Sequence, residues 1–209
     1  MGKVKFGLKN VKYAIWTEGT GNAAGSYGPW KVLTPGAVSL TADIEANSTD
    51  FYAEDTVYAV IDSIAKESGT VEIAYLPEEV KKDLFGYVED STTKLTYLTA
   101  DPKDIHVALG YETSFNDGTK CRGLRYDVKF SPFSESANTM QETTDPETIT
   151  LNYTAVGKKF TVGEGVNAQE LNILKAHVNS GTGENGADES VYTNFFKGVQ
   201  IPGQAVITA

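Results

Sequence analysis

The sequence has few of the residues on which metal sites and many active sites depend. Its 209 residues include one cysteine and two histidines, which excludes a disulfide within one chain and a cysteine-rich metal site. His106 and His177 belong to no metal-ligand spacing, and we interpret both as solvated or structurally satisfied side chains. Cys121 lies beside a strand-like pattern, so we interpret it as a small side chain that is buried or half-buried.

Motifs for nucleotide binding and nucleophilic catalysis are also missing. Residues 181–186 fit the letters of Gly-x-Gly-x-x-Gly, but a helix-like segment precedes them and acidic residues follow, which favours a surface loop. The chain has no Gly-Lys-Ser/Thr phosphate loop and no Gly-x-Ser-x-Gly nucleophile turn. The adjacent acids Glu78 and Glu79 do not converge on one substrate atom. We therefore predict a protein that is not an enzyme, with no catalytic residue, no cofactor and no metal site.

Basic residues and long apolar runs are scarce as well. The chain carries 18 basic and 28 acidic residues, a net charge of −10. Such a protein gains no counterion release from phosphates and has little attraction to anionic membranes, which disfavours static DNA binding. The N-terminal residues resemble no signal peptide, and no stretch approaches the apolar length of a membrane span. We expect a soluble protein, made in a cytoplasm, without membrane anchoring.

What the sequence does contain is apolar residues at alternate positions. Hydrophobic residues make up 40% of the chain, which is enough for a core. Period-two alternation predicts strands with one buried and one polar face over residues 11–16, 38–45, 57–61, 71–75, 104–111, 124–131 and 148–155. Residues 116–119, Asn-Asp-Gly-Thr, lie between two of these runs and are typical of a hairpin turn. The pattern predicts a mainly β protein of antiparallel strands.

Two segments are predicted to be helical. Residues 76–86 have proline near the start, acids in the first turn and glycine at the end, with Val80 and Leu84 on one face. A second short helix near the C-terminus is expected over residues 167–179, where Asn167 and Glu170 resemble a capping box. Beyond Val156 the strand pattern fades. We therefore expect one domain over residues 1–155, with residues 156–209 as its C-terminal extension.

Charge is distributed unevenly along the chain. Residues 32–65 contain no lysine, arginine or histidine, and they contain six acids, namely Asp43, Glu45, Asp50, Glu54, Asp55 and Asp62. Positive charge gathers at the N-terminus, in Lys3, Lys5, Lys9 and Lys12. These lysines fit a nucleic-acid arm, a solvated edge strand or an arm that docks on an acidic neighbour. The acidic segment favours the last interpretation, because patches of opposite charge meet well across subunits.

The order of several short motifs resembles the major tail protein of long-tailed phages with non-contractile tails. The match covers most of residues 3–155, whereas residues 91–103 and 156–190 match poorly. The resembling residues are Leu33, Pro35 to Leu40, Phe51 to Asp55, Tyr58, Gly69, Glu72 to Ala74, Leu76-Pro77, Asp83 to Gly86, Ala108 to Glu112, Lys120 to Arg122, Tyr126 to Pro132 and Asp145 to Leu151. Residues 191–202, with Phe195, Phe196, Val199 and Pro202, resemble the closing segment of that family.

The resemblance implies a β-sandwich or partly open barrel with one flanking helix. It implies a structural virion protein whose copies close into hexameric rings, which stack into the tail tube around the tape-measure protein. DNA would pass transiently through this tube, and the tail terminator and baseplate-side tail proteins would be further partners. Assembly would take place in the cytoplasm of the bacterial host. The hairpin over residues 38–61 matches a long hairpin of the family, whose loop is thought to reach the adjacent ring or subunit.

The resemblance gives each part of this hairpin an expected role. We expect Val38, Leu40, Ala42 and Ile44 to pack on the core, and Ser39, Thr41, Asp43 and Glu45 to line the lumen, where acids repel DNA. The candidates for contact with the next ring or subunit are Asn47, Asp50, Phe51, Tyr52, Glu54 and Asp55. An ordinary solvated hairpin is the simpler interpretation. A second class of function also stays open: a β-sandwich module that binds a carbohydrate or host surface through Trp16, Tyr27 and Trp30.

Overall fold

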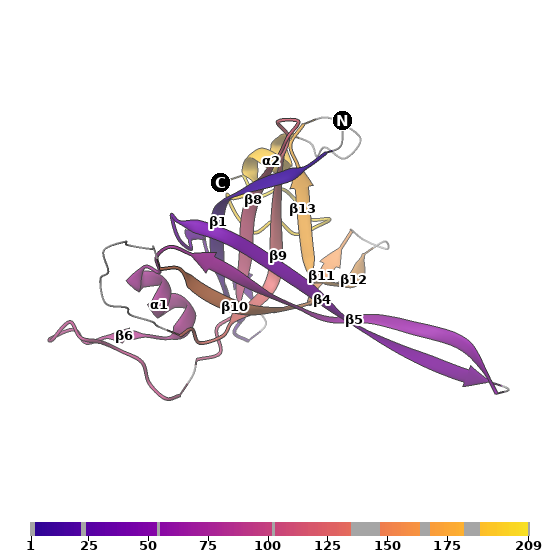
Figure 1. The fold of residues 1–209 in the computed structure, drawn as a ribbon, viewed down its shortest axis with the longest axis horizontal. Helices are drawn as coiled ribbons and strands as arrows, with labels where there is room; N and C mark the ends of the chain where they lie inside the picture. The colour runs from indigo at the N-terminus through magenta and orange to yellow at the C-terminus, as the bar shows by residue number, and fades with distance from the viewer. Residues whose placement is uncertain are drawn as a thin grey trace.

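The alternating runs form long antiparallel strands, so the predicted mainly β fold is confirmed (Figure 1). The computed structural model describes residues 3–21, 24–53, 55–101, 103–134, 147–163, 168–181 and 189–208. Nine strands form the main sheet, in the order β2-β1-β8-β9-β10-β5-β4, with β3 paired to β1 and β13 paired to β9. Their bounds are β1 Lys5–Thr17, β2 Ser26–Tyr27, β3 Lys31–Val32, β4 Ala37–Ala53, β5 Thr56–Ile73, β8 Val107–Phe115, β9 Lys120–Phe130, β10 Ile149–Val156 and β13 Lys175–Asn179. The run predicted at 57–61 and the first three residues of the run predicted at 71–75 belong to the single strand β5, which ends at Ile73.

The sheet forks at β9, and this fork produces two layers. The first half of β9 pairs with β13, where Arg125 faces Lys175, and the second half pairs with β10, where Val128 faces Ala155. In Figure 1, β10, β5 and β4 consequently run obliquely to β1, β8, β9 and β13. A first core cluster fills the space between the layers, with Val11, Tyr13, Val71, Ile73, Leu109, Val128, Leu151 and Tyr153 among its members. The two-layer arrangement is that of a β-sandwich.

The predicted helix at 76–86 is confirmed as α1, Glu78–Phe85, which flanks the first core. Pro77 precedes it, and Gly86 ends it in the left-handed conformation at φ 75°, with its N–H donated to the carbonyl of Lys81. Val80 and Leu84 are buried, as their spacing predicted. The turn at residues 116–119 also forms as predicted, between β8 and β9.

The helix predicted over residues 167–179 is wrong. Gln169–Ile173 is strand β12, which pairs with β11, Lys158–Val162, and the following residues form β13 on the edge of β9. The apolar spacing that suggested a helix also fits strands, and pairing with an open sheet edge decides between the two. A short C-terminal helix does form, but at α2, Glu189–Asn194. A two-stranded hairpin of β6, Val88–Glu89, and β7, Thr96–Tyr97, completes the described elements.

Residues after Val156 cover the outer face of β1, β8 and β9. A second buried cluster forms there from Ala14, Ala108, Leu124, Tyr126, Phe160, Val178, Phe195 and Val199. Tyr126 donates its hydroxyl to the carbonyl of Gln200 at 2.9 Å, which fixes the C-terminal segment on this face. In the described part of the chain, no helix has the length and apolar character needed to cross a membrane.

Gly69 allows β4, β5 and β10 to pack closely. A Cβ atom at this position would lie 2.2 Å from the carbonyl oxygen of Thr41 and 2.5 Å from the hydroxyl of Tyr153. We predict that Gly69→Ala lowers the free energy of unfolding by about 1–3 kcal/mol, because backbone and a buried tyrosine must both shift. Urea unfolding measures the change. Ser63→Ala, on an exposed part of β5, is the control and should change stability by less than about 0.5 kcal/mol; equal effects of the two substitutions would contradict the packing.

A candidate assembly surface

The layer formed by β4, β5 and β10 has a polar face that points away from the first core. Side chains alternate across a strand, so Ser39, Thr41, Asp43 and Glu45 share one face of β4. The strand register sets them beside Glu72, Thr70, Ser68 and Lys66 of β5, and these in turn beside Thr150, Asn152 and Thr154 of β10. The four residues predicted to line a lumen therefore belong to a continuous, hydroxyl-rich surface across three strands. We call this set of residues the polar face.

Hydrogen bonds between neighbouring strands hold the polar face in order. Ser39 donates to a carboxylate oxygen of Glu72 at 3.0 Å, and Thr148 donates to the other at 2.7 Å. The hydroxyls of Thr41 and Thr70 lie 2.7 Å apart. The polar atoms of these side chains are therefore engaged with one another across the strands.

The polar face is less acidic than the sequence alone suggests. Lys66 directly follows the segment that lacks basic residues, and its ammonium group lies 3.4 Å from the carboxylate of Glu45. Ser68 donates to the other oxygen of the same carboxylate at 2.9 Å. The pairing of Glu45 with Lys66 depends on the register of β4 against β5, which residue order does not reveal.

The side chains expected to pack on the core do so only in part. Leu40 packs against the first cluster, whereas Val38, Ala42 and Ile44 are exposed, Val38 by 52% and Ile44 by 46%. Val38 lies at an irregularity of the β4–β5 register, and Ile44 lies where the hairpin leaves the body. The expectation for Val38, Ala42 and Ile44 is therefore wrong, because no element of the described chain covers the hairpin at those points.

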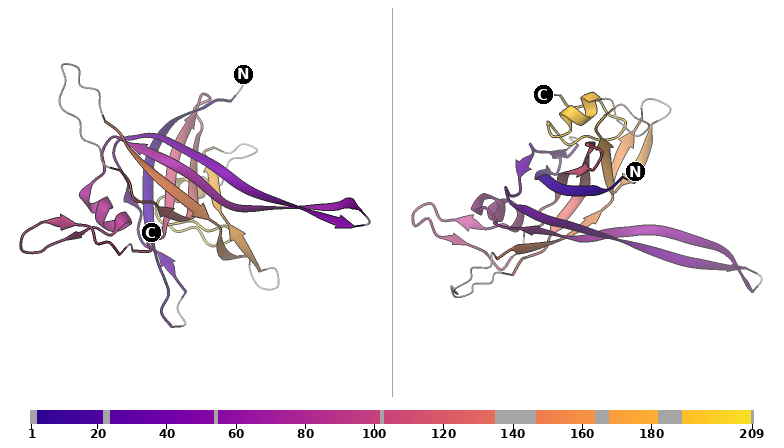
Figure 2. Two further views of the ribbon diagram at one scale, coloured as in Figure 1. Left: turned by 60° about the horizontal axis from the view of Figure 1, so that its bottom comes forward. Right: turned by 45° about the horizontal axis from the view of Figure 1, so that its top comes forward.

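Residues 44–64 extend beyond the body as a two-stranded ribbon, which we call the arm (Figure 1, Figure 2). The candidate contact residues lie on it, but the acidic segment is mostly strand rather than loop. Asn47, Asp50, Phe51 and Tyr52 are paired within the β4–β5 ladder, and Asp55 forms the turn with φ 58°. Glu54 lies outside the described residues.

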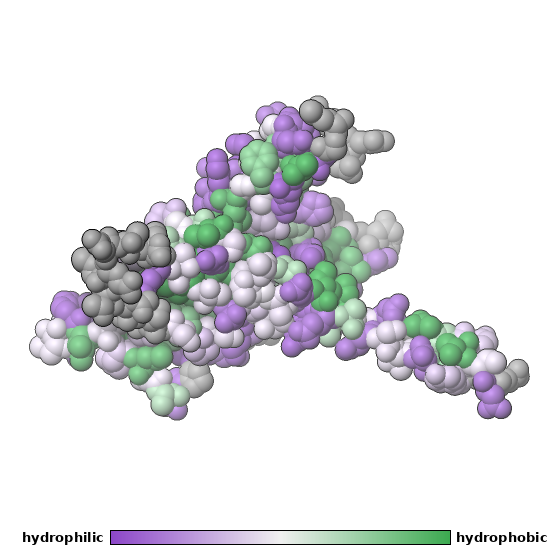
Figure 3. Space-filling view, in the orientation of Figure 1, coloured by the Kyte–Doolittle hydropathy of each residue, from purple (hydrophilic) through white to green (hydrophobic). Residues whose placement is uncertain are grey.

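The arm exposes an unusual amount of apolar surface, visible as green patches in Figure 3. The large apolar side chains exposed on it are Ile44, Phe51, Tyr52, Val57, Tyr58, Val60 and Ile64. Phe51 and Tyr58 pack edge to face, with ring centroids 6.3 Å apart. A two-stranded ribbon has no interior of its own, and exposed apolar patches of this kind mark interaction surfaces. The arm therefore has the composition of a surface that another molecule covers.

The N-terminal lysines belong to a sheet strand rather than to a free arm. Lys5, Lys9 and Lys12 lie in β1, and their register partners on β8 are Phe115, Glu112 and Gly110. The ammonium group of Lys3 lies 3.1 Å from a carboxylate oxygen of Asp117, in the turn after β8. The ammonium groups of Lys5 and Lys12 lie 5.5 and 4.8 Å from the ring centroids of Tyr111 and Phe196.

A buried ionic cluster fixes the root of the arm. Glu67 of β5 is fully buried and accepts hydrogen bonds from Arg125 of β9, Lys175 of β13 at 2.8 Å and the hydroxyl of Tyr153 at 3.3 Å. Burial alone would raise the pKa of Glu67, but the hydrogen bonds from Lys175 and Arg125 outweigh burial and leave the pKa below its ordinary value. One carboxylate thus joins four strands at the point where the arm begins. Neither this cluster nor its partners could be recognised from sequence spacing.

The remaining candidates for chemistry are engaged in structural contacts. His106 lies 2.5 Å from the carboxylate of Asp127, and the predicted burial of Cys121 is confirmed at 6% exposure. Among the described residues, no group of three histidine, cysteine or acidic side chains could hold a metal ion. Trp16 packs edge to face on Tyr27 with centroids 4.8 Å apart, and both rings line a hollow together with Lys158 and Phe160.

No protein-family model and no curated protein matches this sequence. The resemblance to a tail protein therefore stays a prediction, and any function has to be supported by the surfaces themselves. The structure brings the predicted lumen residues together on the polar face, places five of the six predicted contact residues on the arm, and holds three of the four predicted N-terminal lysines in β1, with Lys3 just before it.

The buried cluster makes a prediction about stability and pH. Glu67→Gln should lower the free energy of unfolding at pH 7 by about 3–5 kcal/mol, because Arg125 stays buried without its counter-charge. The lowered pKa of Glu67 means that its stabilising contribution is present above the ordinary pKa of 4.5 and is lost as the pH falls through the folded-state value. The difference between wild type and variant should therefore shrink in acid.

Guanidinium unfolding of both proteins from pH 7 downward measures this difference. The control is Glu45→Gln, which removes an exposed carboxylate from a pair with Lys66 and should cost less than about 1 kcal/mol. A difference for Glu67→Gln that stays constant or widens as the pH falls would contradict the assignment.

Proposed function

We propose that this protein is a structural, non-enzymatic subunit of the tail tube of a phage with a non-contractile tail. Copies would close into hexameric rings that stack into a tube, as the resemblance implies. The observation that carries the proposal is the combination of an uncovered polar face, built from three strands, with an arm whose apolar side chains have no cover within the described chain. The polar face suits the wall of a conduit, and the arm suits attachment to a neighbour.

The chemistry of the polar face suits the passage of DNA. Protein contacts to phosphates come chiefly from arginine and lysine, and also from hydrogen-bond donors. On the polar face the hydroxyls of Ser39, Thr41 and Thr70 are engaged with neighbouring side chains, and Lys66 is paired with Glu45. Asp43 adds a carboxylate that repels the duplex. A wall of this kind gives a moving duplex nothing to bind.

The edges of the sheet support assembly with other copies. Throughout the described residues, the ladder of β4 is formed with β5 alone, so the other edge of this 17-residue strand carries unpaired N–H and C=O groups. Exposed edges of this length pair readily with further strands. Side-by-side pairing of β4 with a neighbouring subunit would satisfy them and would join the sheets of a ring into one barrel.

The remaining partners would contact the tube in its lumen and at its two ends. The tape-measure protein would fill the tube before DNA passes, and the tail terminator and baseplate-side proteins would cap its two ends. The site of action would be the virion tail, after assembly in the bacterial cytoplasm. Negative-stain images of concentrated protein should show rings or tubes. Compact single particles that bind glycans would instead favour the alternative, a carbohydrate-binding or host-surface module.

A charge reversal on the polar face tests the lumen assignment. Virions carrying Asp43→Lys with Glu45→Lys should form tails of normal length but eject DNA at least about tenfold more slowly, because two lysines per subunit create phosphate anchors along the wall. The rate is measured by dye uptake into ejected DNA. The control is Glu78→Lys with Asp101→Lys, the same charge change at exposed positions away from the polar face. Normal ejection by the first variant would contradict the assignment.

A further inference from the structure

A cleft opens where the first half of β1 diverges from β4. One hollow of about 430 Å³ is lined by Lys5 to Leu8 of β1, by Val38, Leu40 and Ala42 of β4, and by Tyr111, Thr113 and Arg125. A second hollow of about 340 Å³ shares Lys5, Tyr111 and Arg125 with the first and adds Lys175 and His177 of β13. We call the two together the β1 cleft. It lies on the body of the protein, beside the root of the arm.

The β1 cleft is positively charged within an acidic protein. Lys5, Arg125 and Lys175 contribute three positive charges, and only Glu67 among its ionic contacts offsets one of them. The ammonium of Lys5 and the guanidinium of Arg125 lie 5.5 and 5.2 Å from the ring centroid of Tyr111. In the described part of the chain, Lys5 has no carboxylate within ion-pair distance. The cleft therefore attracts an acidic ligand.

One hydroxyl behind the wall of the cleft has no partner. Thr113 is only 7% exposed and lines the cleft, and its buried Oγ1 has no hydrogen-bond partner among the described residues. Buried hydroxyls are normally paired, so the packing of this wall is incomplete in the single chain. Leu8 and Leu40, both half-buried, add apolar contact surface next to it.

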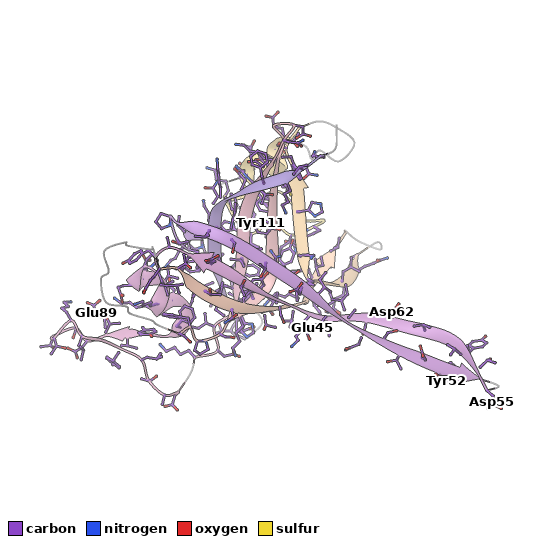
Figure 4. All side chains as sticks on the ribbon, viewed as in Figure 1. Glu45, Tyr52, Asp55, Asp62, Glu89 and Tyr111 are labelled. Carbon is purple, nitrogen blue, oxygen red and sulfur yellow. The ribbon has the colours of Figure 1, made fainter. Side chains whose placement is uncertain are left out.

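The arm has the complementary chemistry. Its register places Asp50 opposite Val60, Asp62 opposite Ser48 and Ile64 opposite Ala46, all on one face of the ribbon. Two carboxylates thus alternate with aliphatic side chains, and residues 44–64 contain no basic residue. Figure 4 shows Asp62, Tyr52 and Asp55 along the arm and Tyr111 on the body, well apart from them. Because the arm points away from the body, it does not reach the cleft of its own chain.

We propose that the arm of one copy docks into the β1 cleft of a second copy. Asp50 and Asp62 pair with the two exposed cations of the cleft, Lys5 and Lys175, while Val60 and Ile64 pack against Leu8 and Leu40. The inference rests on the proposed function, since it names the surface that receives the arm in the assembled tube. The two contacting surfaces differ, so the contact can repeat head-to-tail from copy to copy, as the proposed tube requires.

Charge reversal on each side tests this docking. Lys5→Glu and Asp50→Lys should each weaken self-association about tenfold or more, and the double variant should recover to within about threefold of wild type, because the pair is restored with its signs exchanged. Sedimentation velocity over a concentration series gives the association constants. The control is Lys94→Glu, the same charge change on a side chain that is 72% exposed on the β6–β7 hairpin. Unchanged association of both single variants would overturn the docking.

Cross-linking locates the contact without relying on charge. Two full-length chains lacking Cys121 through Cys121→Ser are mixed, one with Val60→Cys on the arm and one with Phe6→Cys at the cleft, both at exposed positions. We expect disulfide-linked heterodimers in high yield, and several-fold less with Leu95→Cys as the second partner, which is 65% exposed elsewhere. Equal yields would overturn the docking. Tubes that form despite equal yields would leave the tube proposal standing, whereas specific cross-links in particles without a lumen would support the docking and refute the tube.

Discussion

The β4–β5 pairing is longer than any other strand pairing in the described fold. β4 and β5 have 17 and 18 residues, whereas β10, which pairs with the base of β5, has 8. Beyond β10 the two strands have only each other, so about ten residues on each extend ~30 Å from the body. The exposed apolar side chains of the arm result from this difference in length, and the open edge of β4 results from its place at the end of the strand order.

The direction of the arm is set by its root rather than by its own contacts. Glu67 connects β5 to β9 and β13 through Arg125 and Lys175, and Tyr153 links the same carboxylate to the carbonyl of Thr41 on β4. Breaking a buried pair of this kind is costly, so the cluster holds both layers and the arm in one arrangement. A fixed root would let a thin and exposed arm meet a neighbour at a defined position in the tube that we propose.

Local rules predicted much of this fold from the sequence. Alternation located the strands, and the Pro77 and Gly86 signals located α1 within a residue or two. The same alternation placed Ser39, Thr41, Asp43 and Glu45 on one face of the strand, because the face to which a side chain points depends only on its position along the strand. Pairing partners depend on distant segments, and this is why Lys66 beside Glu45, the cluster around Glu67 and the strand β13 in place of a helix were beyond sequence reasoning. The β1 cleft likewise forms from strands far apart in the chain.

In the proposed tube, the polar face forms the inner wall of an assembly of many copies, and each arm is covered by a neighbour. Electron cryomicroscopy of the assembled particle, at a resolution that traces side chains, is the decisive measurement. We expect a hollow cylinder with Thr41, Thr70 and Asn152 on the wall of the lumen, β4 joined to a strand of the next subunit, and no arm left in solvent. Particles without a lumen, or a cylinder that carries these residues on its exterior, would contradict it.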